Sequence, residues 1–529
     1  MSDSKPHINA HSDSHLAATI GKNTIFGILA TGVQIGTRLI TVPIVISHLG
    51  LGGYGIWSII MVTGAYMRFG SAGIKSAFQK YVAEATGNGD FETANRLVST
   101  GSISMLAISV AGLVPIAILS QRLAKASGVT PEFLHSAAAS ITVLAIIYAI
   151  SNFGAAFEAI VMGGHRIDLT RKCNTVLSVC EAAAIIFLLH LGYGLLAMTL
   201  VIGISELLYI FFCYLVSHRV VPQMRISVAN FTTKVFPELM RFAGSYQLVN
   251  MLELCYGAVL PIVILRFFGP DAAGIFAVTT RVVTSCLVAQ DALVLPILSG
   301  GTMVFASGSP ERVRLFLAKA FKVTLAASLP PLAFVSVFGA TLAFAWTGQS
   351  DPRFREAMWL VAAAALFKAL SLLQLVLYRA SGRALLDNIR QVLRIMVILV
   401  VAYFARRLGF EGVLAGMAGA ELVGVMFMFY AMAHVFKSFS ARLLTRDAFK
   451  LSVATLIIIS AGALVGLIHI PGDLPNRIAA AVKLAAIGLG CLAAAWPALA
   501  LTHSVSENEK QSVIDVLTGG RKRLLVANH

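Results

Sequence analysis

Basic side chains inside apolar stretches are the residues of this sequence most suited to chemistry. Five of the 41 lysines and arginines lie in such stretches: Arg38, Arg68, Arg281, Lys368 and Lys483. A charge at the centre of a bilayer costs at least about 2.5–3.5 kcal/mol, so we expect these residues to serve a function. Arginine stays protonated and offers planar, bidentate donors, which favours binding of an anionic group. Each residue could instead pair with a carboxylate on a neighbouring helix, and Lys483 lies close enough to an end to snorkel.

Carboxylates occur in the same apolar stretches and could carry an ion. They are Glu158, Glu181, Glu206, Glu253, Asp291 and Glu421. Low dielectric pushes a carboxylate towards its neutral form, which makes it a natural proton carrier. Our candidates for ion coupling are Glu253, Asp291 and Glu421. Structural pairing is the alternative for all six, and Glu158, near a cytoplasmic end, is expected to cap its helix or to pair with Arg166.

The composition indicates which elements must position these charges. Of the 529 residues, 57% are hydrophobic and 12% are charged. A soluble domain carries about a quarter charged residues, so a disordered chain, a disulfide-rich module and an ordinary soluble enzyme are excluded. A helix needs about 20 mostly apolar residues to cross a bilayer. Fourteen stretches predict an all-α polytopic membrane protein: 23–48, 54–74, 97–119, 137–162, 173–191, 193–216, 242–266, 273–305, 321–344, 357–378, 386–404, 412–436, 451–470 and 478–502.

The net charge of +16 is explained by topology. With a cytoplasmic N-terminus, 28 of the 41 basic residues fall in inner segments, including Arg390 and Arg394, and 8 fall in outer loops. This asymmetry follows the positive-inside rule. It predicts an even number of spans with both termini cytoplasmic, and it removes the need for a nucleic-acid partner.

An internal duplication relates the two halves of the chain. Pro43-Ile44-Val45-Ile46, then Gly50 and Gly55, recurs 218 to 219 residues later as Pro261-Ile262-Val263-Ile264, then Gly269 and Gly274. Gly164 and Gly382, and Gly194 and Gly412, are related by the same offset. Each repeat holds six spans, so both copies enter the bilayer in the same direction. In secondary transporters the substrate site lies at the interface between such repeats.

The duplication predicts six segments. These are a cytoplasmic tail (1–22), a six-helix lobe (23–216), a cytoplasmic linker (217–241), a second six-helix lobe (242–436), two additional transmembrane helices (437–502) and a cytoplasmic tail (503–529).

Two six-helix lobes with two extra helices resemble the O-antigen-type polysaccharide flippases of the multidrug/oligosaccharidyl-lipid/polysaccharide exporter superfamily. The local sequence from Leu49-Gly50 to Tyr54-Gly55-Ile56-Trp57 is similar to that family's first outer loop. Phe69-Gly70-Ser71-Ala72-Gly73 and Lys80-Tyr81-Val82-Ala83-Glu84 are similar to its first inner loop. Arg68 departs from the family, in which this position is often acidic or polar.

The resemblance implies a function and a location. The family moves an undecaprenyl-diphosphate-linked oligosaccharide from the inner to the outer leaflet of the bacterial cytoplasmic membrane, for surface polysaccharide export. It does so by alternating access about a cationic cavity, coupled to an ion gradient or the membrane potential. The resemblance implies that Arg38, Arg68, Arg281 and Lys368 bind the diphosphate, with polysaccharide assembly proteins as possible partners.

Two other functions are weighed against this one. A multidrug antiporter of the same superfamily would usually have twelve spans and an acidic cavity. An envelope glycan polymerase or ligase would ordinarily need a sizeable outer loop or a catalytic cluster. The sequence has no phosphate-binding GxxxxGK[ST] loop, no HExxH, no GxSxG and no CxxC pair, so we expect neither an enzyme nor a bound cofactor or metal.

Overall fold

The computed structural model describes residues 10–68, 72–291, 293–306, 309–371, 373–374, 377–378, 381, 383–436, 441–467 and 476–504. Nearly all of these residues are helical, and none of them lies in a strand. Ten helices in the described ranges are long and apolar enough to cross a bilayer. The predicted all-α polytopic membrane fold is therefore confirmed.

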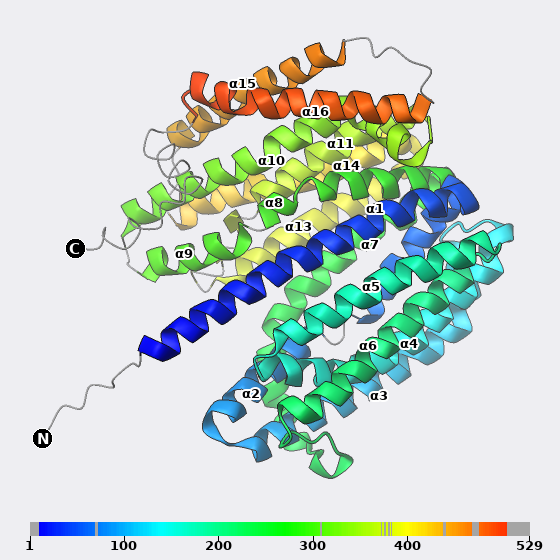
Figure 1. Cartoon of the computed structure of the whole chain (residues 1–529), viewed down its shortest axis with the longest axis vertical. Helices are drawn as coiled ribbons and strands as arrows, with labels where there is room; N and C mark the ends of the chain where they lie inside the picture. The colour runs from blue at the N-terminus through cyan, green and yellow to red at the C-terminus, as the bar shows by residue number, and fades with distance from the viewer. Residues whose placement is uncertain are drawn as a thin grey trace, which may run out of the picture. The chain divides into compact units, whose positions relative to one another are not determined.

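The chain divides into two compact units, residues 1–277 (unit 1) and 278–529 (unit 2), which are described separately. In unit 1, helix α4 packs against α3 and α6, and α1 packs along α5 (Figure 1). The helices of this unit are α1 (Ala10–Arg68), α2 (Ala72–Asn88), α3 (Phe91–Ala126), α4 (Pro131–Gly163), α5 (Ile167–His190), α6 (Leu195–Val220), the short turns η2 (Val228–Asn230) and η3 (Thr233–Val235), and most of α7 (Phe236–Ser285).

Unit 2 begins within the last part of α7. Its helices α10, α11 and α14 pack together, and α15 and α16 pack against each other and against α10. The helices are α8 (Val288–Asp291), α9 (Val294–Ala306), α10 (Pro310–Thr347), α11 (Arg353–Leu370), α13 (Ala384–Tyr403), α14 (Ala405–Tyr430), the π-turn η4 (Ala431–Val435), α15 (Ala441–Gly466) and α16 (Asn476–Leu501). The predicted linker 217–241 contains the end of α6, both short turns and the start of α7, and the division into repeat lobes stays a prediction.

Glycine kinks join pairs of predicted spans into single long helices. Gly50 interrupts α1 with φ 70° and ψ 172°, and Gly269 interrupts α7 with φ 86° and ψ 176°. Only glycine adopts this conformation without strain. Each kink lies between two predicted spans, so α1 and α7 each turn at this point instead of ending.

Left-handed glycines also reveal the internal repeat. Gly50 and Gly269 are 219 residues apart, Gly128 and Gly348 are 220 apart, and Gly192 and Gly409 are 217 apart. All six have positive φ values. Positions that need glycine for backbone reasons thus recur at the offset found in the sequence.

Three predictions about the helices were wrong in detail. The stretch 273–305 is not one span: α7 ends at Ser285, and α8 and α9 follow. Proline at position 296 suits the first turn of α9, where its missing N–H is not needed. The stretch 357–378 is also interrupted, because α11 ends at Leu370. Lys368 therefore lies in the last turn of α11 and not at mid-helix.

Two equivalent glycines of the repeat permit a close helix crossing within unit 1. A Cβ atom at Gly55 would collide with the backbone of Pro270 and Gly274. A Cβ atom at Gly274 would collide in turn with the carbonyl of Leu51. The segments that follow the two kinks therefore touch backbone to backbone, a contact that no larger residue allows at these positions.

Candidate intramembrane charge site

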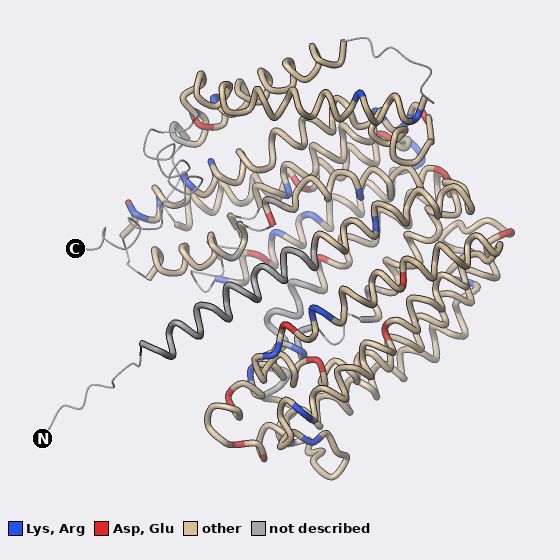
Figure 2. Tube along the Cα trace, viewed as in Figure 1, with Lys and Arg blue, Asp and Glu red and all other residues tan. Residues whose placement is uncertain are grey.

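Charged residues are sparse along the long helices, as Figure 2 shows, so the few that occur there define the candidate site. Arg38 lies on α1, twelve residues before Gly50. At a rise of 1.5 Å per residue, this is about 18 Å along the helix from the kink. The Arg38 side chain is exposed in the isolated chain. An arginine exposed to lipid at this depth would be costly, which favours a hydrated surface around it.

A carboxylate from the neighbouring helix shares the surroundings of Arg38. Glu181 on α5 interacts electrostatically with Arg38 and with Glu206 of α6, and it hydrogen-bonds to Ser205. The interaction is possible because α1 and α5 pack along each other. Arg38 thus has an acidic partner, which was one of the two alternatives left open by the sequence.

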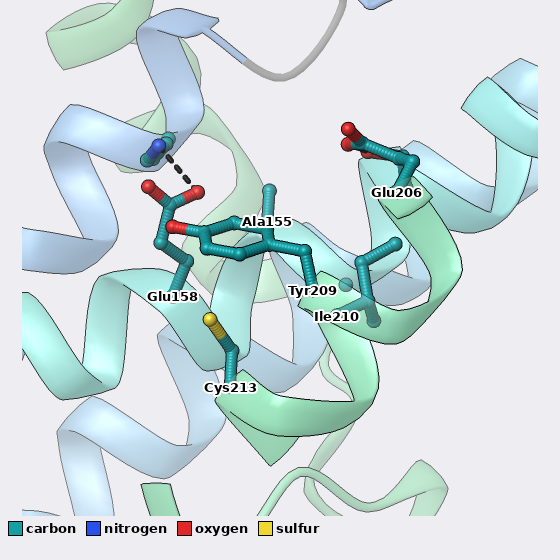
Figure 3. Close-up of a pocket in the computed structure, with 9 residues that line it drawn as sticks. Ala155, Glu158, Glu206, Tyr209, Ile210 and Cys213 are labelled. Atoms are coloured by element: carbon teal, nitrogen blue, oxygen red, sulfur yellow. Dashed lines mark hydrogen bonds and ion pairs between the residues drawn. The ribbon is translucent and has the colours of Figure 1, made fainter. Parts of the chain in front are cut away.

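A polar pocket lies between α4 and α6 in the same unit (Figure 3). Ser151 Oγ on α4 donates a 2.5 Å hydrogen bond to Glu206 Oε1 on α6. Glu158, seven residues after Ser151, hydrogen-bonds with Tyr209 of α6. The pocket offers about 40 Å³ to water-sized molecules, which is room for about three waters. It can hold water or a small cation but not a glycolipid headgroup.

Lys75 closes the end of this pocket near the start of α2. Its Nζ lies 2.5 Å from Glu158 Oε2. The predicted pairing of Glu158 with Arg166 is wrong, because Arg166 instead pairs with Asp168, at 3.0 Å. Arg166 precedes α5 directly, so the acid two residues later is within easier reach than Glu158, which lies inside α4.

The sequence analysis noticed Glu158 and Glu206 but did not select them for ion coupling. Their pattern held a usable signal. Glu206, Tyr209 and Cys213 have the spacing i, i+3, i+7 on α6, and Ser151 and Glu158 have the spacing i, i+7 on α4. These spacings place each set on one face of its helix. Only the packing of α4 against α6 shows that the two polar faces meet.

Arg281 has no ionic partner among the described residues. It lies on α7, twelve residues after Gly269, and its side chain is half-buried. No carboxylate in the described part of the chain forms an ion pair with it. Its guanidinium, about 18 Å along the helix from its own kink, can therefore donate to an anionic ligand.

Asp291 and Lys368 form a second charged pair in unit 2. Asp291 ends α8 and Lys368 lies in the last turn of α11, and both side chains are exposed. The charge of Lys368 acts directly on the Asp291 carboxyl group. The breaks after α8 and α11 thus leave an acid and a base near each other at helix ends.

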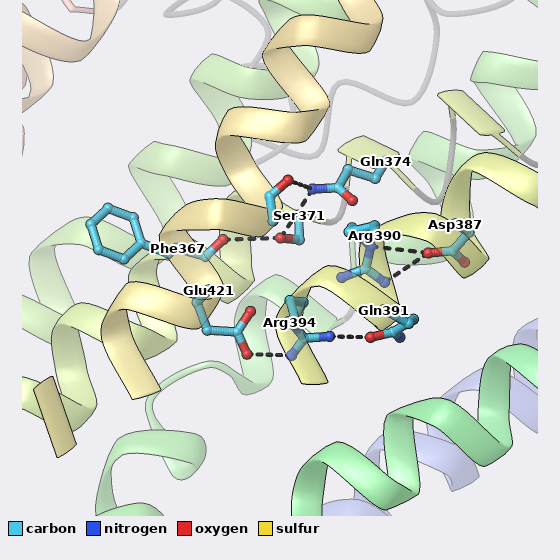
Figure 4. A network of polar contacts seen from close by, with 9 residues as sticks. Phe367, Ser371, Gln374, Asp387, Arg390, Gln391, Arg394 and Glu421 are labelled. Atoms are coloured by element: carbon cyan, nitrogen blue, oxygen red, sulfur yellow. Dashed lines mark hydrogen bonds and ion pairs between the residues drawn. The ribbon is translucent and has the colours of Figure 1, made fainter. Parts of the chain in front are cut away.

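Glu421 is the most buried of the predicted coupling residues (Figure 4). Its side chain is 1% exposed and accepts a hydrogen bond from Arg394 Nη2, and Arg394 is also 1% exposed. Arg394 Nη1 donates to Gln391 Oε1 at 2.5 Å. The assignment of Arg394 to a cytoplasmic segment was wrong, since it lies ten residues into α13 and pairs with a residue of α14.

Two remaining candidates are placed less completely. Arg68 is the last residue of α1, and its side chain lies outside the described part of the structure. Glu253 lies on α7, sixteen residues before Gly269, with a half-buried side chain that has an interaction partner. Within the described ranges, no group of three or more histidine, cysteine or acidic side chains could hold a metal ion.

Comparisons with known proteins identify the fold. No protein-family model matches the sequence, and no curated protein matches it. Among solved structures, the chain is similar to the lipid II flippase MurJ in an inward closed conformation, with a TM-score of 0.67 and 14% identity over 89% of this chain and 98% of that one. It is similar to an inward-facing multidrug resistance MATE family transporter of the MOP superfamily, with a TM-score of 0.65 and 16% identity over 77% and 96%.

A third solved structure belongs to the same superfamily. It is a MOP superfamily transporter from Pyrococcus furiosus, described as having a binding pocket of reverse polarity, with a TM-score of 0.59 and 16% identity over 79% of this chain and 96% of that one. At these identities the likeness concerns the fold alone. The chain therefore has the fold shared by MATE and MurJ transporters.

Proposed function

We propose that this chain is a membrane transporter that moves an undecaprenyl-diphosphate-linked oligosaccharide from the inner to the outer leaflet by alternating access, for surface polysaccharide export. The observation that carries the proposal is Arg281, an arginine on a long apolar helix without an ionic partner among the described residues. A diphosphate that crosses a bilayer needs compensating charge on its path, and arginine supplies bidentate donors for it. Arg38, Lys368 and Arg68 are proposed to contribute further positive charge.

The fold supports a transporter, and its extent favours the flippase reading. The MurJ structure aligns with 89% of this chain, whereas the MATE structure aligns with 77%. A flippase also agrees with a chain that continues through α15 and α16 after the second predicted lobe. We place the protein in the bacterial cytoplasmic membrane with both termini inside, where polysaccharide assembly proteins would be its partners.

A multidrug antiporter is the alternative, and the acids of unit 1 bear on it. The pocket between α4 and α6 contains Glu158 and Glu206, which would suit a cation. Its volume of about 40 Å³ excludes a drug-sized molecule, which needs several hundred. We therefore propose that these acids, with Glu253 and Asp291, serve a coupling proton or sodium ion. Glu421 is held by Arg394, which favours a structural role for it.

The test measures flipping of a fluorescent undecaprenyl-diphosphate oligosaccharide in proteoliposomes. A hydrogen bond to a charged group contributes about 1.5–3 kcal/mol, so Arg281→Ala should weaken substrate binding about 10- to 150-fold. Arg38→Ala should have a smaller effect, because Glu181 competes with the substrate for this arginine. Lys483→Ala, which removes a basic residue of α16, is the matched control and should flip normally.

Two outcomes would contradict the proposal. Full activity of both Arg38→Ala and Arg281→Ala would remove the diphosphate site. Export of cationic dyes by the purified protein, without flipping of the lipid-linked probe, would favour the multidrug antiporter. In cells, deletion of the gene should leave undecaprenyl-linked glycan on the inner leaflet, and normal export of every surface glycan would refute the function.

A further inference from the structure

Two imidazole rings meet where α1 and α5 approach each other in unit 1. His48 lies on α1, two residues before the Gly50 kink, and His190 is the last residue of α5. Their ring centroids are 4.7 Å apart, with an angle of 59° between the ring planes. Both side chains are exposed, so an ion from solution can reach them without crossing the packed helices.

The backbone fixes the tautomer of both rings. His48 Nδ1 lies 2.8 Å from the carbonyl oxygen of Ile44, and His190 Nδ1 lies 2.8 Å from that of Ile186. A carbonyl oxygen only accepts hydrogen bonds, so each Nδ1 must carry the proton. Each neutral ring then keeps its lone pair on Nε2. Metal-binding histidines in proteins are oriented by the same kind of bond from the non-ligating nitrogen.

We propose that His48 and His190 bind one transition-metal ion through their Nε2 atoms. Imidazole nitrogen suits Cu²⁺, Ni²⁺ and Zn²⁺, with Cu²⁺ bound most tightly in the usual order of affinities. Metal–nitrogen bonds of about 2.0–2.1 Å place two ligand nitrogens of one ion about 3 Å apart. Rotation of two exposed rings whose centroids lie 4.7 Å apart can bring the nitrogens to that separation.

The site has two protein ligands, and water completes the coordination. No third histidine, cysteine or carboxylate joins the pair among the described residues. The ion is therefore exchangeable, unlike the ion of a closed four-ligand structural site. Its effect is mechanical: it ties the part of α1 between Pro43 and Gly50 to the end of α5. Because Pro43 cannot donate a backbone hydrogen bond, this part of α1 is the one that most needs an external restraint.

The test is isothermal titration of the purified full-length protein, without a polyhistidine tag, with NiCl₂, ZnCl₂ and CuCl₂. His7, His11 and His15 are replaced by alanine in every protein compared, because histidines so close in sequence bind metals themselves. The background protein should bind one ion per chain. His48→Ala and His190→Ala should each weaken this binding by about tenfold or more, as loss of a ligand does.

His218 supplies a matched control. Its Nδ1 also bonds to the carbonyl four residues earlier, that of Tyr214, at 2.9 Å, but its ring contacts a tyrosine ring and not a second imidazole. His218→Ala should leave the affinity unchanged. Both histidines of the proposed site are exposed, so the variants should fold, and His190→Gln provides a second test that keeps a polar side chain.

Melting temperature gives an independent readout. NiCl₂ should raise it in the background protein and in His218→Ala, but not in His48→Ala or His190→Ala. Equal affinity for metal in the background protein and in His48→Ala would overturn the proposal, whatever the protein transports.

Discussion

Replacing Glu421 by glutamine is expected to destabilise the protein by about 3–5 kcal/mol, because it leaves the positive charge of Arg394 buried without its counterion. Both side chains are 1% exposed, so water cannot take over the role of the lost carboxylate. Gln391, which accepts a bond from Arg394 Nη1, is neutral and cannot do so either. Arg394→Met, which leaves the carboxylate buried alone, should cost a similar amount.

The double variant separates a structural from a coupling role for Glu421. Buried ion pairs replaced by apolar residues of similar size are often as stable as before, so Arg394→Met with Glu421→Leu should recover most of the loss. The two single effects should therefore be strongly non-additive. Unfolding is followed through tryptophan fluorescence in detergent, and flipping is measured on the same preparations.

The results expected from a structural pair are two unstable single variants and a double variant that is stable and active. A stable double variant that does not flip would instead make Glu421 a coupling residue. If Glu421→Gln costs less than about 1 kcal/mol, or if the double variant loses the sum of the two single effects, the account of the buried pair is refuted.

Three further predictions concern other parts of the chain. Gly55→Val should lower thermal stability, by about 1–3 kcal/mol or more, because its side chain would collide with the backbone of Pro270; Gly36→Ala, where a Cβ meets nothing within 4 Å, is the control. Glu206→Gln should keep the fold but abolish the response of flipping to an ion gradient, since an amide cannot carry a proton. The Arg353 side chain lowers the pKa of Asp351, which lies in the loop before α11, so Asp351→Asn should cost at most about 1 kcal/mol near pH 7. That difference in melting temperature should disappear as the pH falls through the lowered pKa, below about pH 4; a constant difference would contradict this account.

The sequence was sufficient where one residue type has one physical meaning. Long apolar stretches can only be buried in membrane or core, so the all-α fold followed from composition and length. Gly50 and Gly269 were visible as members of a repeat, and the structure shows the backbone reason for them. The break after Ser285 was not predicted, because the residues around it are as apolar as those of a continuous span.

Pairing between helices was beyond the reach of the sequence. Arg394 has the same spacing from Arg390 and Asp387 whether it faces the cytoplasm or Glu421. Which of these it faces depends on the rotation of α13 relative to α14, and that is decided by packing. The same holds for Glu158, whose partner Lys75 is 83 residues away in sequence.

The two repeat-related arginines differ in a way that bears on the direction of binding. Arg38 has the carboxylate of Glu181 beside it, so an anionic ligand must displace an existing interaction. Arg281 has no ionic partner among the described residues, so an anionic ligand would relieve the cost of a half-buried charge. The duplication thus preserved the helices and their kinks while the electrostatic surroundings of the arginines diverged. A transporter whose two halves bind the same diphosphate with unequal strength has a preferred order of contacts, and Arg281 is the contact that the ligand would release last.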